Sequence, residues 1–310
     1  MHELGRIYCL SGCTAVGKTD LALEWALAND AEIVNCDSLL FYRGMDIGTA
    51  KPTAAERRRV PHHLIDIMEP SDRMDVGCFV ELAVDAISQI QARGKSVLAT
   101  GGSGFYLKAF FEPVVDSVQV SEETRTWVAG LMEEGLALAV AELRRRNPNG
   151  LGRLDADNPR RVVKALERCI ESGTTLEELE AAFARERSPL ADAEKALTIL
   201  ERDRDELSAR IALRVSRMLD EGLLDEVERL RATGFESNPS AAGAIGYREA
   251  LVHLNGEMDR GEMVERICIN TRRLAKKQRT WFRGQLPGYA RFVDVGGGRA
   301  VGIEALFSPR

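Results

Sequence analysis

Around residue 12 the chain contains a glycine-rich loop, and the residues on either side of it limit the fold that can contain it. Residues Gly12–Thr19 read GCTAVGKT and fit the pattern G-x-x-x-x-G-K-[ST]. The apolar run Ile7–Leu10 before them predicts a buried strand, and the spacing of apolar residues in Lys18–Ala28 predicts a helix. Because such a loop binds phosphate between a strand and a helix N-terminus, the sequence predicts an α/β fold.

The elements that follow extend this prediction to a P-loop NTPase-like core with a parallel sheet. Ala31–Asn35 and Ser96–Thr100 are typical of strands, and Val80–Ala92 is typical of a helix between them. Residues 113–199 are predicted mainly as helices, at 122–134, 136–146, 158–172 and 176–187. A strand-like run at 196–200 precedes a long helical region at about 205–283. We therefore expect an α/β core of residues 1–112 and 200–310, interrupted by a helical insertion at 113–199.

Composition excludes several classes of protein. The 310 residues are 45% hydrophobic and 29% charged, with a net charge of −6, which excludes collagen-like, low-complexity and disordered chains. No apolar run approaches the roughly 18 residues of a membrane helix, and Met1–Arg6 lacks the pattern of a signal peptide. The six scattered cysteines favour reduced thiols over disulfides or a zinc site. We expect a cytoplasmic monomer without membrane attachment.

The loop by itself does not identify the reaction, because many nucleotide-binding and ATP-binding proteins share it. An NTPase should also have a strand of four apolar residues ending in Asp, and Leu64–Asp66 is too short for one. Phe292–Gly297 resembles the D-x-x-G of GTPases, but it is interpreted as a terminal strand and turn because no N-K-x-D accompanies it. A nucleoside or nucleotide kinase therefore remains an alternative at this point.

A carboxylate follows the second strand. Asp37 and Ser38 come directly after Ala31–Asn35, at the edge of a parallel sheet that faces the ligand crevice. Asp37 can bind Mg²⁺ through water or accept a proton, and it can equally be a turn or helix-capping residue. The glycine-containing segment Tyr42–Pro52 that follows favours a functional role, and Thr53 with Glu56 predicts a capping box.

Together these segments resemble the tRNA dimethylallyltransferase (IPP transferase) family. The resemblance rests on blocks that occur in the family's order and cover nearly the whole chain. The blocks are Gly12–Thr19, Asp37-Ser38, Gly44–Pro52 (GMDIGTAKP), Pro61–Asp66 (PHHLID), Gly101–Ala109 (GGSGFYLKA), Asn158–Arg161 (NPRR), Ala244–Arg248 (AIGYR) and Thr271–Arg283 (TRRLAKKQRTWFR).

Five residues depart from the family's pattern. Cys13 stands where the family usually has Pro, and Leu40 where many members have Gln. Ser103 replaces Thr and keeps the hydroxyl, Asn158 replaces Asp, and Gly243 replaces Arg or Gln. These departures bear on individual RNA contacts and on the stiffness of the loop, and they leave the predicted reaction unchanged.

The resemblance implies transfer of a dimethylallyl group from dimethylallyl diphosphate to the exocyclic amine of the adenosine 3′ of the anticodon in tRNA, with Mg²⁺ as cofactor. The implied catalytic residues are Asp37, Lys18, Thr19 and Arg214, with Arg210 the nearest competitor for the diphosphate-clamping role of Arg214. The implied diphosphate-binding residues are Gly12, Cys13, Thr14, Ala15, Val16, Gly17, Lys18 and Thr19, and the Thr19 hydroxyl is the candidate Mg²⁺ ligand. The implied contacts to the tRNA anticodon stem-loop are Asp37, Ser38, Leu39, Leu40, Ser103, Arg125, Arg160, Arg161, Val162, Val163, Lys164, Gly243, Ala244, Ile245, Gly246, Tyr247, Arg248, Lys276, Lys277, Gln278, Arg279, Thr280, Trp281, Phe282 and Arg283.

Basic residues are concentrated towards the end of the predicted helical region. Arg272, Lys276, Arg279 and Arg283 are spaced to lie on one face of a helix, and no Asp or Glu lies between Arg266 and Asp294. The resemblance implies that the core of 1–112 and 200–310 is catalytic and that the insertion at 113–199 binds tRNA. The insertion contains a second basic stretch, which comprises residues 144–146, 153, 160, 161 and 164. Segregated basic surfaces on an acidic protein are typical of RNA binding, although each alone can be a solvated face. The remaining alternatives are the kinase and a non-catalytic RNA-binding protein.

Overall fold

The computed structural model describes residues 5–298 and 301–307. The predictions for residues 1–4, 299–300 and 308–310 lie outside the described residues. They concern part of the N-terminal segment, which lacks a signal-peptide pattern, and part of the C-terminal segment. The chain divides into two compact units, Met1–Glu112 with Ser188–Arg310, and Pro113–Arg187.

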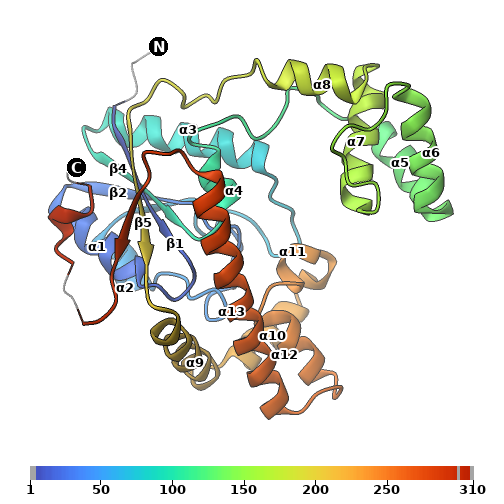
Figure 1. The fold of residues 1–310 in the computed structure, drawn as a ribbon. Helices are drawn as coiled ribbons and strands as arrows, with labels where there is room; N and C mark the ends of the chain where they lie inside the picture. Colours follow the sequence, from blue (N-terminus) through green and yellow to red (C-terminus); the bar gives the residue numbers. More distant parts are fainter. Residues whose placement is uncertain (1–4, 299–300, 308–310) are drawn as a thin grey trace. The chain divides into compact units, whose positions relative to one another are not determined.

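The first unit is built on a parallel sheet, which confirms the predicted α/β class (Figure 1). Its strands are β1 (Ile7–Gly12), β2 (Ala31–Asn35), β3 (His62–His63), β4 (Ser96–Gly101), β5 (Lys195–Glu201) and β6 (Arg291–Asp294). In the described part of the chain their order is β3-β2-β4-β1-β5-β6, and every neighbouring pair is parallel. Strand β3, only two residues long, was not predicted.

The position of β1 in the sheet explains where a ligand can bind. The chain leaves β1 and returns to its two sides as β4 and β5, so that Leu10 pairs with Thr100 on one side and Thr198 on the other. In an open parallel sheet, the carboxyl ends of such strands border a crevice. The phosphate-binding loop leaves β1 at this edge.

Helices surround the sheet and continue beyond it. The first unit contains α1 (Lys18–Ala28), α2 (Ala54–Arg59), α3 (Val76–Ala92), α4 (Gly104–Lys108), α9 (Arg204–Asp220), α10 (Leu223–Arg231), α11 (Pro239–Ala242), α12 (Tyr247–Leu254) and α13 (Arg260–Gln285), with 3-10 turns η1 (Phe235–Ser237) and η2 (Ile303–Ala305). The predicted capping box of Thr53 and Glu56 starts α2. The long helical region is divided at Gly222, which lies between α9 and α10, and at Gly246, which directly precedes α12; both have a φ of 97°, which glycine adopts readily.

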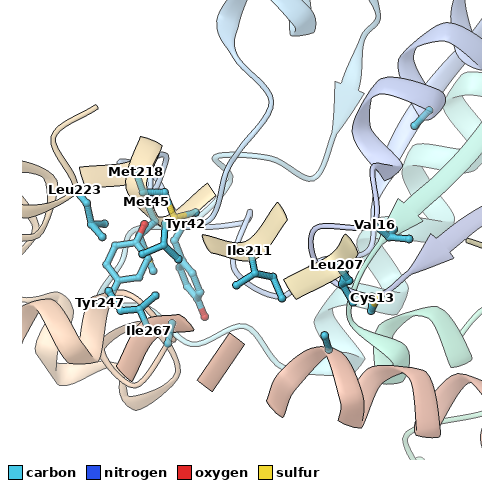
Figure 2. Close-up of a cluster of buried hydrophobic side chains, with 14 of the residues drawn as sticks. Cys13, Val16, Tyr42, Met45, Leu207, Ile211, Met218, Leu223, Tyr247 and Ile267 are labelled. Carbon is cyan, nitrogen blue, oxygen red and sulfur yellow. The ribbon is translucent and has the colours of Figure 1, made fainter. Parts of the chain in front are cut away.

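A continuous apolar core joins the loop to the C-terminal helices. Figure 2 shows Cys13 and Val16 beside Leu207 and Ile211, so that α9 covers the phosphate-binding loop. The same cluster continues to Tyr247, which is fully buried. Packing of α9 against the loop therefore fixes where the arginines of α9 point.

The second unit is helical. It contains α5 (Glu122–Glu134), α6 (Leu136–Arg146), α7 (Pro159–Ser172) and α8 (Leu176–Phe183), which pack on their own core around Val128, Leu143 and Leu166. The unit ends at Arg187, earlier than the expected boundary at residue 199. Residues 188–199 belong to the first unit because β5 pairs with β1 along its length.

Candidate functional site

A cavity of about 850 Å³ opens in the first unit at the carboxyl ends of the strands. The phosphate-binding loop, the segment after β2, the segment after β4 and the helices α9 and α13 all contribute to its lining. Among the expected catalytic residues, Lys18, Thr19, Asp37 and Arg214 all line this cavity. The structure therefore brings together side chains that are far apart in the sequence.

Lys18 lies at the base of the loop. Its Nζ donates hydrogen bonds to the carbonyl oxygens of Gly12, at 2.8 Å, and Cys13, at 2.9 Å. Burial lowers the pKa of Lys18 to about 8, while the negative charge of Asp37 opposes this shift. A lysine that lines the cavity and is held by two carbonyl oxygens can bind an anion there, because a nearby negative charge stabilises its charged form.

Arg214 reaches the loop from α9. One guanidinium nitrogen donates to Thr14 Oγ1 at 3.1 Å, and another donates to the carbonyl oxygen of Thr49 at 3.2 Å. Burial lowers the pKa of Arg214, and the nearby Asp37 opposes the shift. The guanidinium is thus oriented between two loops and lines the cavity, which is the arrangement of an anion clamp.

Two further arginines donate hydrogen bonds to the same loop. Arg210, the expected competitor of Arg214, donates from Nε to the carbonyl oxygen of Ala15 at 2.9 Å but is itself exposed. Arg202, which no sequence motif indicated, donates from Nε to the carbonyl oxygen of Val16 at 3.2 Å. Its position directly after β5, at the ligand edge of the sheet, is the signal that could have identified it.

Asp37 follows β2 and is hydrogen-bonded through both its backbone and its side chain. Asn35 fixes its backbone, since Oδ1 of Asn35 accepts from the Asp37 N–H at 2.7 Å. The Asp37 carboxylate accepts weakly from the N–H of Leu39 and of Gly102, each at 3.3 Å. These long bonds leave the carboxylate with free acceptor capacity on the cavity side, as a general base requires.

Gln278 connects α13 directly to the site. Its Oε1 accepts from the Thr14 N–H of the loop at 2.9 Å, and its Nε2 donates to the Gly102 carbonyl oxygen at 2.8 Å. On the neighbouring turn, Trp281 packs so closely on Gly104 that a Cβ there would lie 2.3 Å from the indole ring. The helix expected to contact RNA therefore forms one wall of the cavity.

The residues expected to contact tRNA fall into three groups. Those that line the cavity are Asp37, Ser38, Leu39, Leu40, Ser103, Gly243, Ala244, Ile245, Gly246, Lys277, Gln278, Trp281 and Phe282. Those elsewhere in the first unit are Tyr247, Arg248, Lys276, Arg279, Thr280 and Arg283, and those in the second unit are Arg125, Arg160, Arg161, Val162, Val163 and Lys164. The side chains of Tyr247 and Val162 are fully buried, so they pack inside the protein.

The basic face of α13 is less uniform than its spacing indicates. Arg272 and Lys276 are exposed, and Arg279 is half-buried. Arg283 forms an ion pair with Glu201 of β5 at 2.7 Å, although no acidic residue lies near it in the sequence. Arg283 therefore has a partner within the protein, whereas Arg272, Lys276 and Arg279 form no ion pair with the residues that the structure describes.

Oxygen donors at the site fit Mg²⁺. The Thr19 hydroxyl and the Asp37 carboxylate line the same cavity, and hard oxygen ligands are those that Mg²⁺ prefers. In the described part of the chain, no three His, Cys, Asp or Glu side chains gather into a metal-holding cluster. Mg²⁺ usually takes one or two protein ligands and completes its shell with water and substrate phosphates, so the Thr19 hydroxyl could hold it directly and Asp37 through water.

No helix within residues 5–298 and 301–307 is long and apolar enough to cross a membrane.

Comparison with known proteins gives one consistent result. The profile of the IPP transferase family matches residues 40–285. A tRNA dimethylallyltransferase of Opitutus terrae is 58% identical over 290 residues, covering 94% of this chain and 93% of the relative. The tRNA dimethylallyltransferase 1 of Trichlorobacter lovleyi is 40% identical over 281 residues, covering 90% and 91% respectively.

Solved structures agree with these sequence matches. The crystal structure of a full-length tRNA isopentenylpyrophosphate transferase from Bacillus halodurans superposes with a TM-score of 0.67 and 33% identity, covering 94% of this chain and 90% of that one. A eukaryotic dimethylallyltransferase described as acting on tRNA has a TM-score of 0.81 and 24% identity, covering 94% and 74%. The second likeness concerns the fold alone.

Proposed function

The chain belongs to the IPP transferase family, and we propose that its cavity holds dimethylallyl diphosphate while a tRNA adenosine enters from the side of α13. The reaction is transfer of the dimethylallyl group to the exocyclic amine of that adenosine, with diphosphate as the leaving group. The adenosine proposed as acceptor lies 3′ of the anticodon. The observation that carries the assignment of roles is the convergence of Lys18, Arg214 and Asp37 on one cavity.

The loop takes the leaving group rather than a transferred phosphate. The backbone N–H groups of the loop, Lys18 and Arg214 bind the diphosphate and stabilise the charge that builds on it as the carbon–oxygen bond breaks. Thr19 would hold Mg²⁺, which would neutralise part of that charge when bound. The adenine amine forms the new nitrogen–carbon bond, and its proton passes to the Asp37 carboxylate.

The adenine must leave its stack to reach the cavity. In a single-stranded loop this costs less than in a duplex, because the base has no pairing partner to lose. We propose that the wall formed by Gly102, Ser103 and Trp281 receives the extruded base, and that basic residues of α13 and of the second unit hold the RNA backbone. Phosphate contacts of this kind position the RNA without reading its sequence.

A label-transfer assay tests the proposal. Purified protein is incubated with Mg²⁺, radiolabelled dimethylallyl diphosphate and either tRNA or free AMP. We expect label in tRNA. Label in AMP would indicate an adenylate prenyltransferase, phosphate release from ATP alone would indicate a kinase, and retained RNA without any label would indicate a binding protein.

The basic face of α13 gives a prediction of its own. If Lys276 and Arg279 contact tRNA phosphates, the Lys276→Ala, Arg279→Ala double variant loses tRNA affinity most at low salt. The slope of log K against log salt should flatten by about 0.7–0.9 per contact removed, because fewer condensed counterions are released. Filter retention of tRNA across a salt series measures this slope.

The control for this variant is the pair Arg58→Ala, Arg59→Ala on α2, which removes two exposed charges outside the cavity lining. We expect the control to leave the salt slope unchanged. Both variants should bind dimethylallyl diphosphate as the unmodified protein does, since Lys18 and Arg214 are untouched. An unchanged slope in the α13 variant would assign its charges to a solvated face.

A further inference from the structure

Glu226 is a buried carboxylate that binds the backbone of a loop. It lies on α10 with 2% of its surface exposed. Its Oε2 accepts from the N–H groups of Asp46 and Ile47, at 3.0 and 2.7 Å, and its Oε1 accepts from the N–H of Gly48 at 3.1 Å. Three successive amides converging on one carboxylate form a strong, directional anchor, because the charge strengthens each hydrogen bond.

Tyr247 completes this anchor from α12. Its hydroxyl donates to Glu226 Oε1 at 2.6 Å, and burial beside that carboxylate raises the pKa of Tyr247, which keeps the hydroxyl protonated. Figure 2 shows the Tyr247 ring in the apolar cluster with Met45 and Met218. The loop lies directly against this ring, since a Cβ at Gly48 would come within 2.5 Å of it.

A second buried charge holds the other end of the same loop. Nζ of Lys51, whose side chain is 1% exposed, donates to the carbonyl oxygen of Tyr42 at 2.7 Å and pairs with Asp66 at 2.5 Å. It also pairs with Asp46 at 2.7 Å. The segment between residues 42 and 51 is therefore fixed from both sides by buried charged side chains.

The next residue of the loop touches the diphosphate clamp. Directly after Gly48, the carbonyl oxygen of Thr49 accepts from the Arg214 guanidinium at 3.2 Å. The other end of that guanidinium is bound to Thr14 of the phosphate-binding loop. An unbroken series of contacts thus runs from Tyr247 and Glu226 through the loop to Arg214.

We propose that Glu226, with Tyr247, is a positioning residue that orients Arg214 toward the diphosphate through the Gly48–Thr49 backbone. The proposal rests on the clamping role of Arg214 proposed above. The conformation of the loop then serves to place the Thr49 carbonyl oxygen where it holds the Arg214 guanidinium. Errors of about 1 Å in such groups can cost as much as about 100-fold in rate.

The Glu226→Gln variant tests this directly. In this variant an amide nitrogen can take the place of Oε1. It still contacts the Tyr247 hydroxyl, but it cannot accept the hydrogen bond from the Gly48 N–H, so the loop loosens next to Thr49. We expect kcat/KM for dimethylallyl diphosphate to fall about 10–100-fold, with the dissociation constant for tRNA unchanged. The Tyr247→Phe variant, which removes only the hydroxyl, should show a smaller fall of the same kind.

Glu32→Gln is the matched control. Glu32 is another nearly buried carboxylate of the first unit, 7% exposed, and it binds His63 and Arg93 away from the loop. We expect its variant to lose stability in a thermal melt without any change in kcat/KM. A purely structural role for Glu226 would make the two variants alike.

A double-mutant cycle with Arg214→Ala distinguishes the possible failures. If Glu226 acts through Arg214, Glu226→Gln should change kcat/KM less than about twofold once Arg214 is absent, because coupled residues are not additive. An equal fall in both backgrounds would overturn the positioning role. An Arg214→Ala variant with an unchanged kcat/KM would instead overturn the clamp itself. Tyr247→Phe replaces Glu226→Gln in the cycle if the latter does not fold.

Discussion

The Asp37→Asn variant should lose about 10²–10⁴-fold in kcat while binding tRNA almost as before, because a general base contributes a factor of this size. The amide keeps the shape of the side chain and can still accept from the Leu39 N–H, so the segment after β2 keeps its conformation. What it cannot do is take the proton from the adenine amine. Single-turnover label transfer and filter retention of tRNA measure the two quantities separately.

The control for Asp37→Asn lies at the other end of the same strand. Asp30 directly precedes β2 and pairs with Lys95 at the surface, so Asp30→Asn changes a carboxylate next to the strand without touching the cavity. We expect its kcat to be unchanged. If Asp37→Asn lost tRNA affinity in proportion to its rate, Asp37 would be an RNA-recognition residue and the base would have to be sought elsewhere in the cavity.

The Lys18→Ala variant should have the second large effect. Removing one fixed donor to a developing negative charge typically costs about 10²–10³-fold in kcat, and here the KM for dimethylallyl diphosphate should rise as well. In the unmodified enzyme, inorganic pyrophosphate should compete with dimethylallyl diphosphate, because both occupy the loop. Inhibition kinetics with pyrophosphate, compared between the two proteins, measure the contribution of Lys18.

Lys18→Ala also removes two hydrogen bonds to loop carbonyl oxygens, so its fold must be checked. The matched control is Lys195→Ala, because Lys195 also donates from Nζ to backbone carbonyl oxygens, at the opposite end of β5 from the cavity. The control should keep its kcat and its inhibition by pyrophosphate. Normal turnover by a folded Lys18→Ala variant would show that the loop does not bind the leaving group.

Much of this fold follows from local sequence patterns. The loop motif gave β1 and α1 together, since the motif needs a strand before it and a helix after it. The apolar runs that became β2, β4 and β5 are buried strands long enough for a pattern to be visible. Strand β3 was missed because two residues cannot show a periodicity. The boundary at residue 199 was placed too late because the segment before β5 has no helical or strand pattern.

Site residues that belong to a sequence motif could be predicted, whereas those that tertiary contacts bring to the site could not. Lys18 and Asp37 follow strands, and that position alone directs them to the ligand edge of a parallel sheet. Arg202 follows β5 in the same way but has no motif around it. Glu226 lies within an ordinary helix, and its importance depends on three amides about 180 residues earlier in the chain. No local pattern reports such a contact.

The ion pair of Arg283 illustrates the same limit for charge. No acidic residue lies close to Arg283 in the sequence, so the sequence predicts an unpaired charge. In the structure, Glu201 of β5 forms an ion pair with it. Charge balance is set by neighbours in space, and strands bring distant segments together. The sequence pattern of a basic helix therefore indicates a candidate surface, and the fold decides which of its charges are available.

The way the helical unit joins the first unit has an evolutionary consequence. The chain leaves the sheet unit after α4 and returns before β5, and at this junction the buried Ser188 hydroxyl donates to the Ala109 carbonyl oxygen at 2.9 Å. The two ends of the insertion are thus fastened to each other within the sheet unit. Whatever length of polypeptide lies between them, the strand order around β1 stays the same, so a gene can lengthen, shorten or exchange this segment without rebuilding the catalytic sheet.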